Sequence, residues 1–114
     1  MTEKTESAVN TKELLTIMDY DDSFIKICFE EFLTNSLIML EDIKRAINAK
    51  SPSMLYQTSH KLKGSLQYLA AYPAVKVAYE LEIIGKNGSV DGAQALFCSL
   101  LKEVKRLKVF IAEY

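Results

Sequence analysis

The stretch "DDSFIKICFEEFLTNSLIMLEDIKRAINA", residues 21–49, decides the fold of this chain. Its core-facing positions recur at steps of three and four residues, which places them on one face of a helix. They are Ile25, Cys28, Phe29, Phe32, Ser36, Met39, Leu40, Ile43 and Ile47. Asp21, Asp22 and Ser23 can cap the first turn. The stretch therefore predicts an amphipathic helix about 40 Å long, whose apolar stripe other helices must cover.

Three further helices can cover this stripe. Ser51 followed by Pro52 indicates a helix start, because proline lacks an N–H that the first helical position does not use. We expect this helix to run to about Ala71. Pro73 opens the next helix in the same way, and that helix fades at "GKNGS", residues 85–89. Asp91 can cap the last helix, whose apolar residues keep helical spacing: Ala93, Leu96, Phe97, Leu100, Val104, Leu107 and Ile111.

Four amphipathic helices with short connections predict an all-α fold, an antiparallel up-and-down four-helix bundle. A short additional N-terminal helix is expected from Leu14, Leu15, Ile17 and Met18. We assign residues 12–114 to this bundle domain and residues 1–11 to a disordered polar tail. A chain of 114 residues suffices for one core but not for two. Met1 and the polar start favour a free-standing protein over a domain cut from a larger kinase.

The composition argues against several classes of protein. A net charge of −1 is not that of a nucleic-acid binder. The longest apolar runs, such as "LIML" at residues 37–40, are far short of the ~18 residues of a membrane span. The N-terminus has no apolar core of a secretion signal, so we expect a cytoplasmic protein. Cys28 and Cys98 form no metal-ligand pattern and are expected to pack as reduced, small hydrophobic residues.

The only histidine, His60, lies in "SHKLKGS", residues 59–65. On a helical wheel at about 100° per residue, the leucines of this helix gather in one core-facing sector: Leu55, Leu62, Leu66 and Leu69. His60 lies about 160° from Leu62, on a face shared with Tyr56, Lys63, Gly64 and Gln67. This phase argues against a buried histidine and leaves an ordinary surface histidine open. The surface alternative does not explain Gly64, because glycine inside a helix costs about 1 kcal/mol relative to alanine.

The chemistry around His60 suits a transiently bound phosphoryl group. A neutral imidazole is a competent nucleophile near pH 7. Lys63, one turn away, can meet negative charge at the ring, and Lys61 adds positive potential. Gly64 clears space beside the imidazole for the close approach of another protein's backbone. No second histidine or carboxylate cluster stands at metal-ligand spacing, and no serine–histidine–carboxylate arrangement points to a hydrolase.

Glu82 is out of place in the helix that Pro73 opens. It falls inside the apolar stripe of that helix, which comprises Val75, Ala78, Leu81 and Gly85. Glu82 is either a boundary carboxylate that reaches water or the acceptor of a hydrogen bond from one ring nitrogen of His60. The second role would fix the tautomer and leave the other nitrogen, Nε2, free to attack. Lys86, one turn on, can pair with Glu82 or extend the basic patch.

"SHKLKGS" resembles the signature of histidine-containing phosphotransfer (HPt) domains, a histidine followed by x-x-Lys-Gly and usually a small residue. "YDDSFIKICFEEFL", residues 20–33, is similar to the start of the family's long second helix. "YELEIIG", residues 79–85, looks like the family's "LE" segment, with Glu82 twenty-two residues after His60. The resemblance covers roughly residues 12–110.

This resemblance implies a phosphorelay intermediate of two-component signalling. His60 would receive a phosphoryl group from the aspartate of one receiver domain and pass it to that of another. Lys63 would contact the phosphoryl oxygens, Gly64 would give clearance, and Glu82 would orient the ring as in some members. The chain would be a phosphocarrier and not an enzyme, and its sequence has no P-loop. No cofactor is implied, and the Mg²⁺ would belong to the receiver partner.

The implied partners are response-regulator receiver domains and a hybrid sensor kinase, with no nucleic acid or membrane, and the chain is expected to be a monomer. The partner-docking residues would be Tyr56, Lys61, Gln67 and Lys86. The chain departs from many members at Leu66, Tyr68 and Ala70, where they carry a small residue, an asparagine and a glycine. Leu66 faces the core and reflects different packing, whereas Tyr68 lies nearer the exposed flank and can alter partner choice.

A second interpretation belongs to a different class of function. The chain can be an interaction module that keeps the bundle and binds a kinase or receiver without being phosphorylated. Binding that survives loss of the imidazole, together with no phosphoryl transfer, would favour this alternative. An independent enzyme has little support, since one histidine and one out-of-place glutamate offer no substrate pocket.

Overall fold

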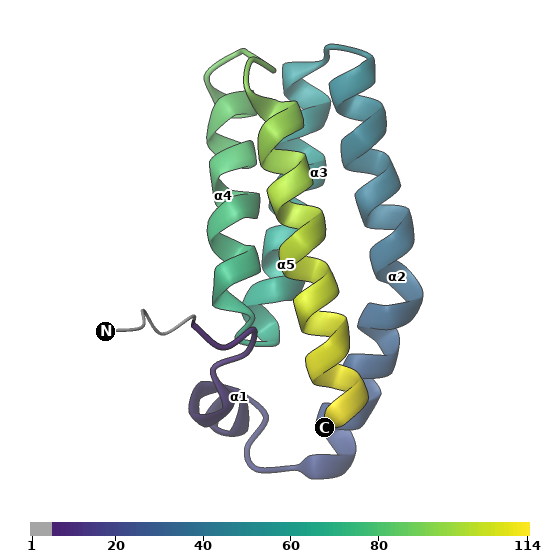
Figure 1. Ribbon diagram of the computed structural model, residues 1–114, viewed down its shortest axis with the longest axis vertical. Helices are drawn as coiled ribbons and strands as arrows, with labels where there is room; N and C mark the ends of the chain where they lie inside the picture. Colours follow the sequence, from purple (N-terminus) through teal and green to yellow (C-terminus); the bar gives the residue numbers. More distant parts are fainter. Residues whose placement is uncertain (1–5) are drawn as a thin grey trace, which may run out of the picture.

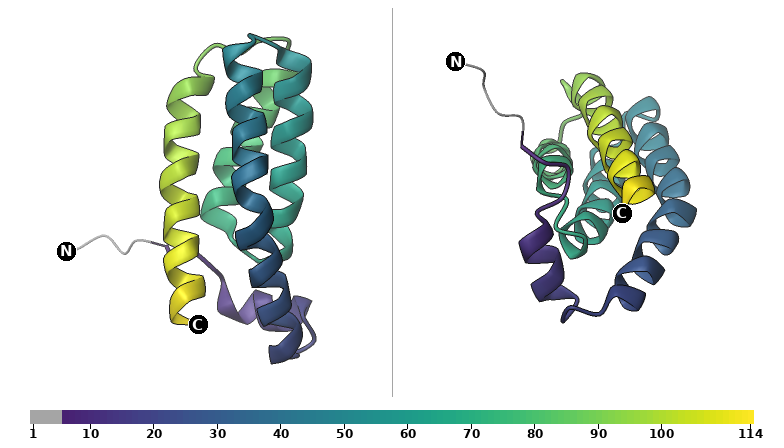
Figure 2. Two further views of the ribbon diagram at one scale, coloured as in Figure 1. Left: turned by 90° about the vertical axis from the view of Figure 1, so that its right-hand side faces the viewer. Right: turned by 60° about the horizontal axis from the view of Figure 1, so that its bottom comes forward.

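The computed structural model describes residues 6–114, which form five helices and no strand (Figure 1). The helices are α1 (Thr11–Ile17), α2 (Asp22–Asn48), α3 (Pro52–Tyr68), α4 (Tyr72–Lys86) and α5 (Ala93–Glu113). Helices α2 to α5 run alternately up and down as a bundle, and α1 lies at the end where α2 begins (Figure 2). The predicted all-α four-helix bundle with a short N-terminal helix is therefore confirmed.

Side-chain caps start α2 and α3 as the sequence predicts. The carboxylate of Asp21 accepts a hydrogen bond from the backbone N–H of Phe24 over 3.1 Å. The hydroxyl of Ser51 accepts one from the backbone N–H of Met54 over 3.2 Å, and Pro52 occupies the first turn. Each cap satisfies one of the N–H groups that a helix leaves without a partner at its start.

Two helix boundaries differ from the prediction. Helix α3 ends at Tyr68, short of the predicted end near Ala71, because the backbone N–H of Ala71 turns back to the carbonyl of Leu66. The predicted cap by Asp91 is wrong, since the residue before α5 is Gly92 at φ 80° and no side chain caps this helix. That left-handed backbone favours glycine, which has no Cβ to clash.

The core is apolar and is lined by one face of each bundle helix. On α2 the predicted stripe is buried except for Cys28 and Ile47, which are partly buried. The four leucines that define the core-facing sector of α3 are all buried: Leu55, Leu62 and Leu66 lie in the helix, and Leu69 directly follows its last residue. Fully burying a leucine stabilises a fold by about 1.5–3 kcal/mol. The burial of these leucines fixes the rotation of α3 and hence the direction of its opposite face.

The segment before α1 packs on the bundle. Val9 is buried, Asn10 caps α1, and the backbone N–H of Asn10 donates to the carbonyl of Ala70 over 2.9 Å. The disordered tail predicted over residues 1–11 is therefore wrong for residues 9–11, because an apolar anchor and backbone hydrogen bonds hold them. Residues 1–5 of that prediction lie outside the described residues.

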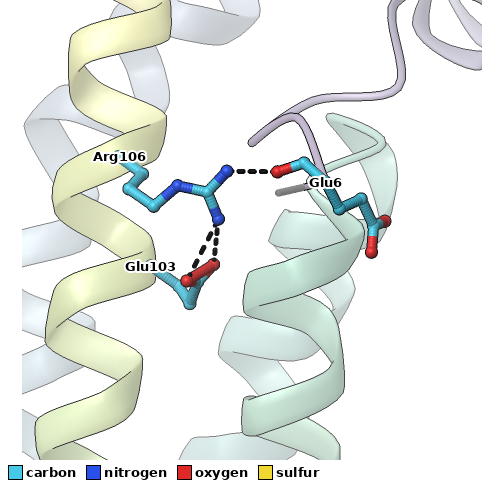
Figure 3. Close-up of polar contacts among 3 residues, drawn as sticks. All are labelled: Glu6, Glu103 and Arg106. Atoms are coloured by element: carbon cyan, nitrogen blue, oxygen red, sulfur yellow. Dashed lines mark hydrogen bonds and ion pairs between the residues drawn. The ribbon is translucent and has the colours of Figure 1, made fainter. Parts of the chain in front are cut away.

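An arginine on α5 contacts the same segment (Figure 3). Arg106 donates to the backbone carbonyl of Glu6 and to both carboxylate oxygens of Glu103, at 2.8 and 3.1 Å. The planar guanidinium presents several donors and so can serve both acceptors at once. No helix in residues 6–114 is long and apolar enough to cross a membrane.

Candidate functional site

Helix α3 presents His60 to solvent. The side chain of His60 is 60% exposed, whereas its neighbour Ser59 and the following Leu62 are buried. One turn earlier, the ring of Tyr56 stacks on the imidazole, with centroids 6.0 Å apart and an interplanar angle of 19°. The imidazole is therefore accessible from outside the bundle and is flanked by an aromatic ring on its own helix.

Glu82 reaches this site from α4. It is only 6% exposed, and its Oε1 lies 3.3 Å from Nδ1 of His60 and 2.7 Å from Nζ of Lys63. The interpretation of Glu82 as a boundary carboxylate that reaches water is therefore wrong. Both distances are within ion-pair range, although Oε1 makes no well-directed hydrogen bond. Glu82 pairs with Lys63 and not with Lys86, which is exposed.

The charge state of Glu82 follows from these contacts. Burial alone raises the pKa of Glu82, but the contacts with Lys63 and His60 outweigh that effect and lower its pKa below the usual value. The carboxylate is consequently ionised near neutral pH. An ionised carboxylate beside Nδ1 favours a proton on that nitrogen and leaves Nε2 unprotonated in the neutral ring.

Lys63 is enclosed, although it lies on the outward half of α3. Its side chain is 15% exposed, and its Nζ lies 2.7 Å from Oε1 of Glu82 and over the ring of Tyr79, 5.1 Å from the ring centroid. Tyr79 was not among the predicted site residues. The sequence does contain an indication of its role: Tyr79 lies three residues before Glu82, and residues at that spacing share one face of a helix.

The two glycines near the site have opposite surroundings. A Cβ built on Gly64 meets no atom within 4 Å, so packing does not require glycine there. A Cβ built on Gly85 would lie 2.6 Å from the backbone N of Tyr56 and 2.7 Å from the carbonyl O of Pro52. Gly85 thus allows α4 to approach the backbone of α3 closely, and it does so one turn beyond Glu82. From the sequence, Gly85 was predicted only as part of the apolar stripe of its helix.

A groove between α2 and α3 borders Gly64. Gly64 and Ser65 contribute to its α3 wall, and its exposed apolar rim comprises Phe24, Ile27 and Tyr68. Tyr68 was predicted to lie near the exposed flank, whereas Phe24 and Ile27 were not among the predicted site residues. On a helical wheel of α2, both are apolar residues outside the core-facing stripe. Such residues indicate an exposed apolar surface and could have been found from the sequence.

The predicted docking residues are not drawn together by direct contacts. Tyr56 is half-buried against His60, whereas Lys61, Gln67 and Lys86 are exposed. Among residues 6–114, no group of three or more histidine, cysteine or carboxylate side chains is placed to hold a metal.

The two cysteines have different environments. Both thiols are free; burial, with a smaller contribution from Glu31, raises the pKa of Cys28. Cys98 is free but exposed, so the prediction that it packs as a small hydrophobic residue is wrong. It lies on the solvent side of α5, off the stripe that contains Phe97.

Comparison with known proteins identifies one family. A family model described as the Hpt domain matches residues 28–109 of the 114-residue chain. Searches of the curated proteins and of the solved structures returned no match. The matched range includes all of α3 and α4, and with them His60, Lys63, Gly64 and Glu82.

Proposed function

The chain belongs to the Hpt domain family, and on that premise we propose that His60 carries a phosphoryl group between the aspartates of receiver domains. Hpt domains are phosphocarrier modules of His–Asp phosphorelays and are not enzymes. One observation carries the assignment to His60: a buried, ionised carboxylate lies 3.3 Å from Nδ1 of an imidazole whose side chain is 60% exposed.

The proposed step is a nucleophilic substitution at phosphorus. Glu82 keeps the proton on Nδ1, so the lone pair of Nε2 attacks the phosphoryl group of an aspartyl phosphate. The N–P bond forms as the P–O bond to the aspartate breaks, and the aspartate leaves as a carboxylate. Attack by a second receiver's aspartate reverses these changes and frees the imidazole.

Lys63 and Gly64 assist this step in the proposal. Lys63 lies one turn from His60 and supplies positive charge beside the ring, where phosphoryl oxygens would arrive. The open space around Gly64 lets the partner's backbone approach. The chain itself needs no cofactor under this scheme, because the receiver binds the Mg²⁺ that shields the phosphoryl charge.

Members of this family work with receiver domains and kinases in two-component systems. For this chain we propose response-regulator receivers and a hybrid sensor kinase as cytoplasmic partners, and a monomeric state. The partners would dock over Tyr56, Lys61, Gln67 and Lys86. The adjoining groove between α2 and α3, with its apolar rim, extends this surface and would bury apolar area on docking.

The test is phosphotransfer from a phosphorylated receiver. Wild-type chain should acquire acid-labile phosphate, and His60→Gln should acquire none while its far-ultraviolet circular dichroism stays helical. His60 is the only histidine, so no other imidazole can contribute to the signal. Phosphate on the glutamine variant would place the acceptor elsewhere. Binding without transfer, unaffected by His60→Gln, would support the non-phosphorylated interaction module instead.

A further inference from the structure

The ammonium group of Lys63 has two partners. Oε1 of Glu82 lies 2.7 Å from Nζ, and the ring of Tyr79 faces Nζ with its centroid 5.1 Å away. Both partners come from α4, whereas Lys63 belongs to α3. A lysine on the outward half of a helix usually extends into water, yet this side chain is 15% exposed.

The face of an aromatic ring carries negative electrostatic potential and attracts a cation placed over it. Tyr79 supplies such a face. The face of its ring binds no proton, so it does not compete with Glu82 or His60 for one. The side chains of Lys63 and Glu82 are only 15% and 8% exposed, while Tyr79, over whose ring the ammonium group lies, is 49% exposed. Excluding water from an ion pair strengthens the pair and weakens its screening by salt.

We propose that Tyr79 is a positioning residue, whose ring holds the Lys63 ammonium group on Glu82 and so keeps it beside His60 before the phosphoryl group arrives. Without the ring, Lys63 would gain rotamers that point into solvent, and Glu82 would more often keep only His60 as a partner. The expected effect of Tyr79 on phosphotransfer rests on the proposed function, whereas its expected effect on the pKa of Glu82 does not.

The first measurement is the titration of Glu82, followed by carboxyl ¹³C NMR, in wild type, Tyr79→Leu and Tyr79→Phe. Lys63 helps to lower the pKa of Glu82, so loosening Lys63 should raise that pKa. A cation–π contact at a partly exposed site changes an equilibrium by about two- to fivefold, which corresponds to about half a pH unit. Tyr79→Leu should show this rise, and Tyr79→Phe, which keeps the ring, should restore the wild-type titration.

The second measurement is the rate of phosphotransfer to His60 in a double-mutant cycle with Lys63→Met. Tyr79→Leu should slow transfer by about two- to fivefold in wild type, and it should have no further effect when Lys63 is already methionine. Tyr79→Phe should restore the rate in the chain that keeps Lys63.

Three results would overturn the inference. One is an unchanged Glu82 titration in Tyr79→Leu, and another is a titration that Tyr79→Phe fails to restore. The third is a rate defect that persists in Lys63→Met, which would mean that Tyr79 contacts the receiver directly. A wild-type chain that accepts no phosphoryl group would instead contradict the proposed function, and the titration would still decide the role of Tyr79.

Discussion

Replacing Gly85 by alanine would place a methyl group between α3 and α4. Its carbon would lie 2.6 Å from the backbone N of Tyr56, 2.7 Å from the carbonyl O of Pro52 and 3.0 Å from the Cα of Tyr56. All three are backbone atoms, so no side chain can rotate away to make room. Ordinary contacts between such atoms begin at about 3.5 Å, so α4 must move by roughly 1 Å.

Two effects oppose each other in this variant. Alanine stabilises a helix interior by about 1 kcal/mol relative to glycine. Overpacking a close contact costs about 1–3 kcal/mol, and contacts with rigid backbone belong at the upper end of that range. We therefore expect Gly85→Ala to lower the free energy of unfolding by about 1–2 kcal/mol. Movement of α4 would also withdraw Glu82, one turn away, from His60 and Lys63.

Urea unfolding measures the change in the free energy of unfolding, and Gly64→Ala is the matched control for Gly85→Ala. Gly64 lies on the neighbouring helix with no atom within 4 Å of the added methyl, so the same substitution should stabilise the fold by about 0.5–1 kcal/mol. The two glycine-to-alanine changes should thus shift the urea midpoint in opposite directions. If Gly85→Ala matched or exceeded the stability of wild type, the close approach of α4 to α3 would be refuted.

Two further predictions concern the site. Gly64→Leu should stay folded, because the position is exposed and open, and should slow phosphotransfer by about tenfold or more by obstructing the partner; unfolding, or an unchanged rate, would contradict the role of Gly64. Glu82→Gln should lower the free energy of unfolding at pH 7 by about 1–3 kcal/mol, because Lys63 loses its charged partner. The folded-state pKa of Glu82 is lowered, so its ionised form stabilises the fold above the unfolded pKa of about 4.3, and this contribution is lost as the pH falls through the folded pKa. The difference in free energy of unfolding between wild type and Glu82→Gln should therefore shrink in acid. A difference that stays constant from pH 7 to pH 3 would show that the ionised carboxylate of Glu82 is not the source of this stability.

The fold was predictable because its determinants are local. The stripe on α2 and the leucines of α3 repeat at helical spacing, and Ser51 with Pro52 marks a helix start through groups that lie next to it in sequence. The outward direction of His60 follows from the same periodicity, since residues on one helix keep fixed angles to each other. The burial of Leu62 and the exposure of His60 agree with that calculation.

The features that sequence reasoning missed depend on a second element. Tyr79 matters because its ring faces Lys63 across the α3–α4 boundary, and Gly85 matters because the backbone of Tyr56 lies against it. A helical wheel of α4 shows which face each residue occupies but gives neither the height nor the spacing of α3. The burial of Val9 was missed for a related reason, because a single apolar residue in a polar segment gives no periodic signal.

The separation of roles between α3 and α4 explains why His60 can be both exposed and oriented. If the carboxylate were on α3 itself, only positions three or four residues from His60 could reach the ring, and Tyr56, Lys63 and Gly64 already occupy three of them. Placing Glu82 on α4 allows it to be buried in the bundle while its Oε1 reaches Nδ1 from beneath. The imidazole then keeps an open outer side. The spacing of α3 and α4, which Gly85 permits, is consequently the quantity that links the packing of this bundle to the chemistry of its histidine.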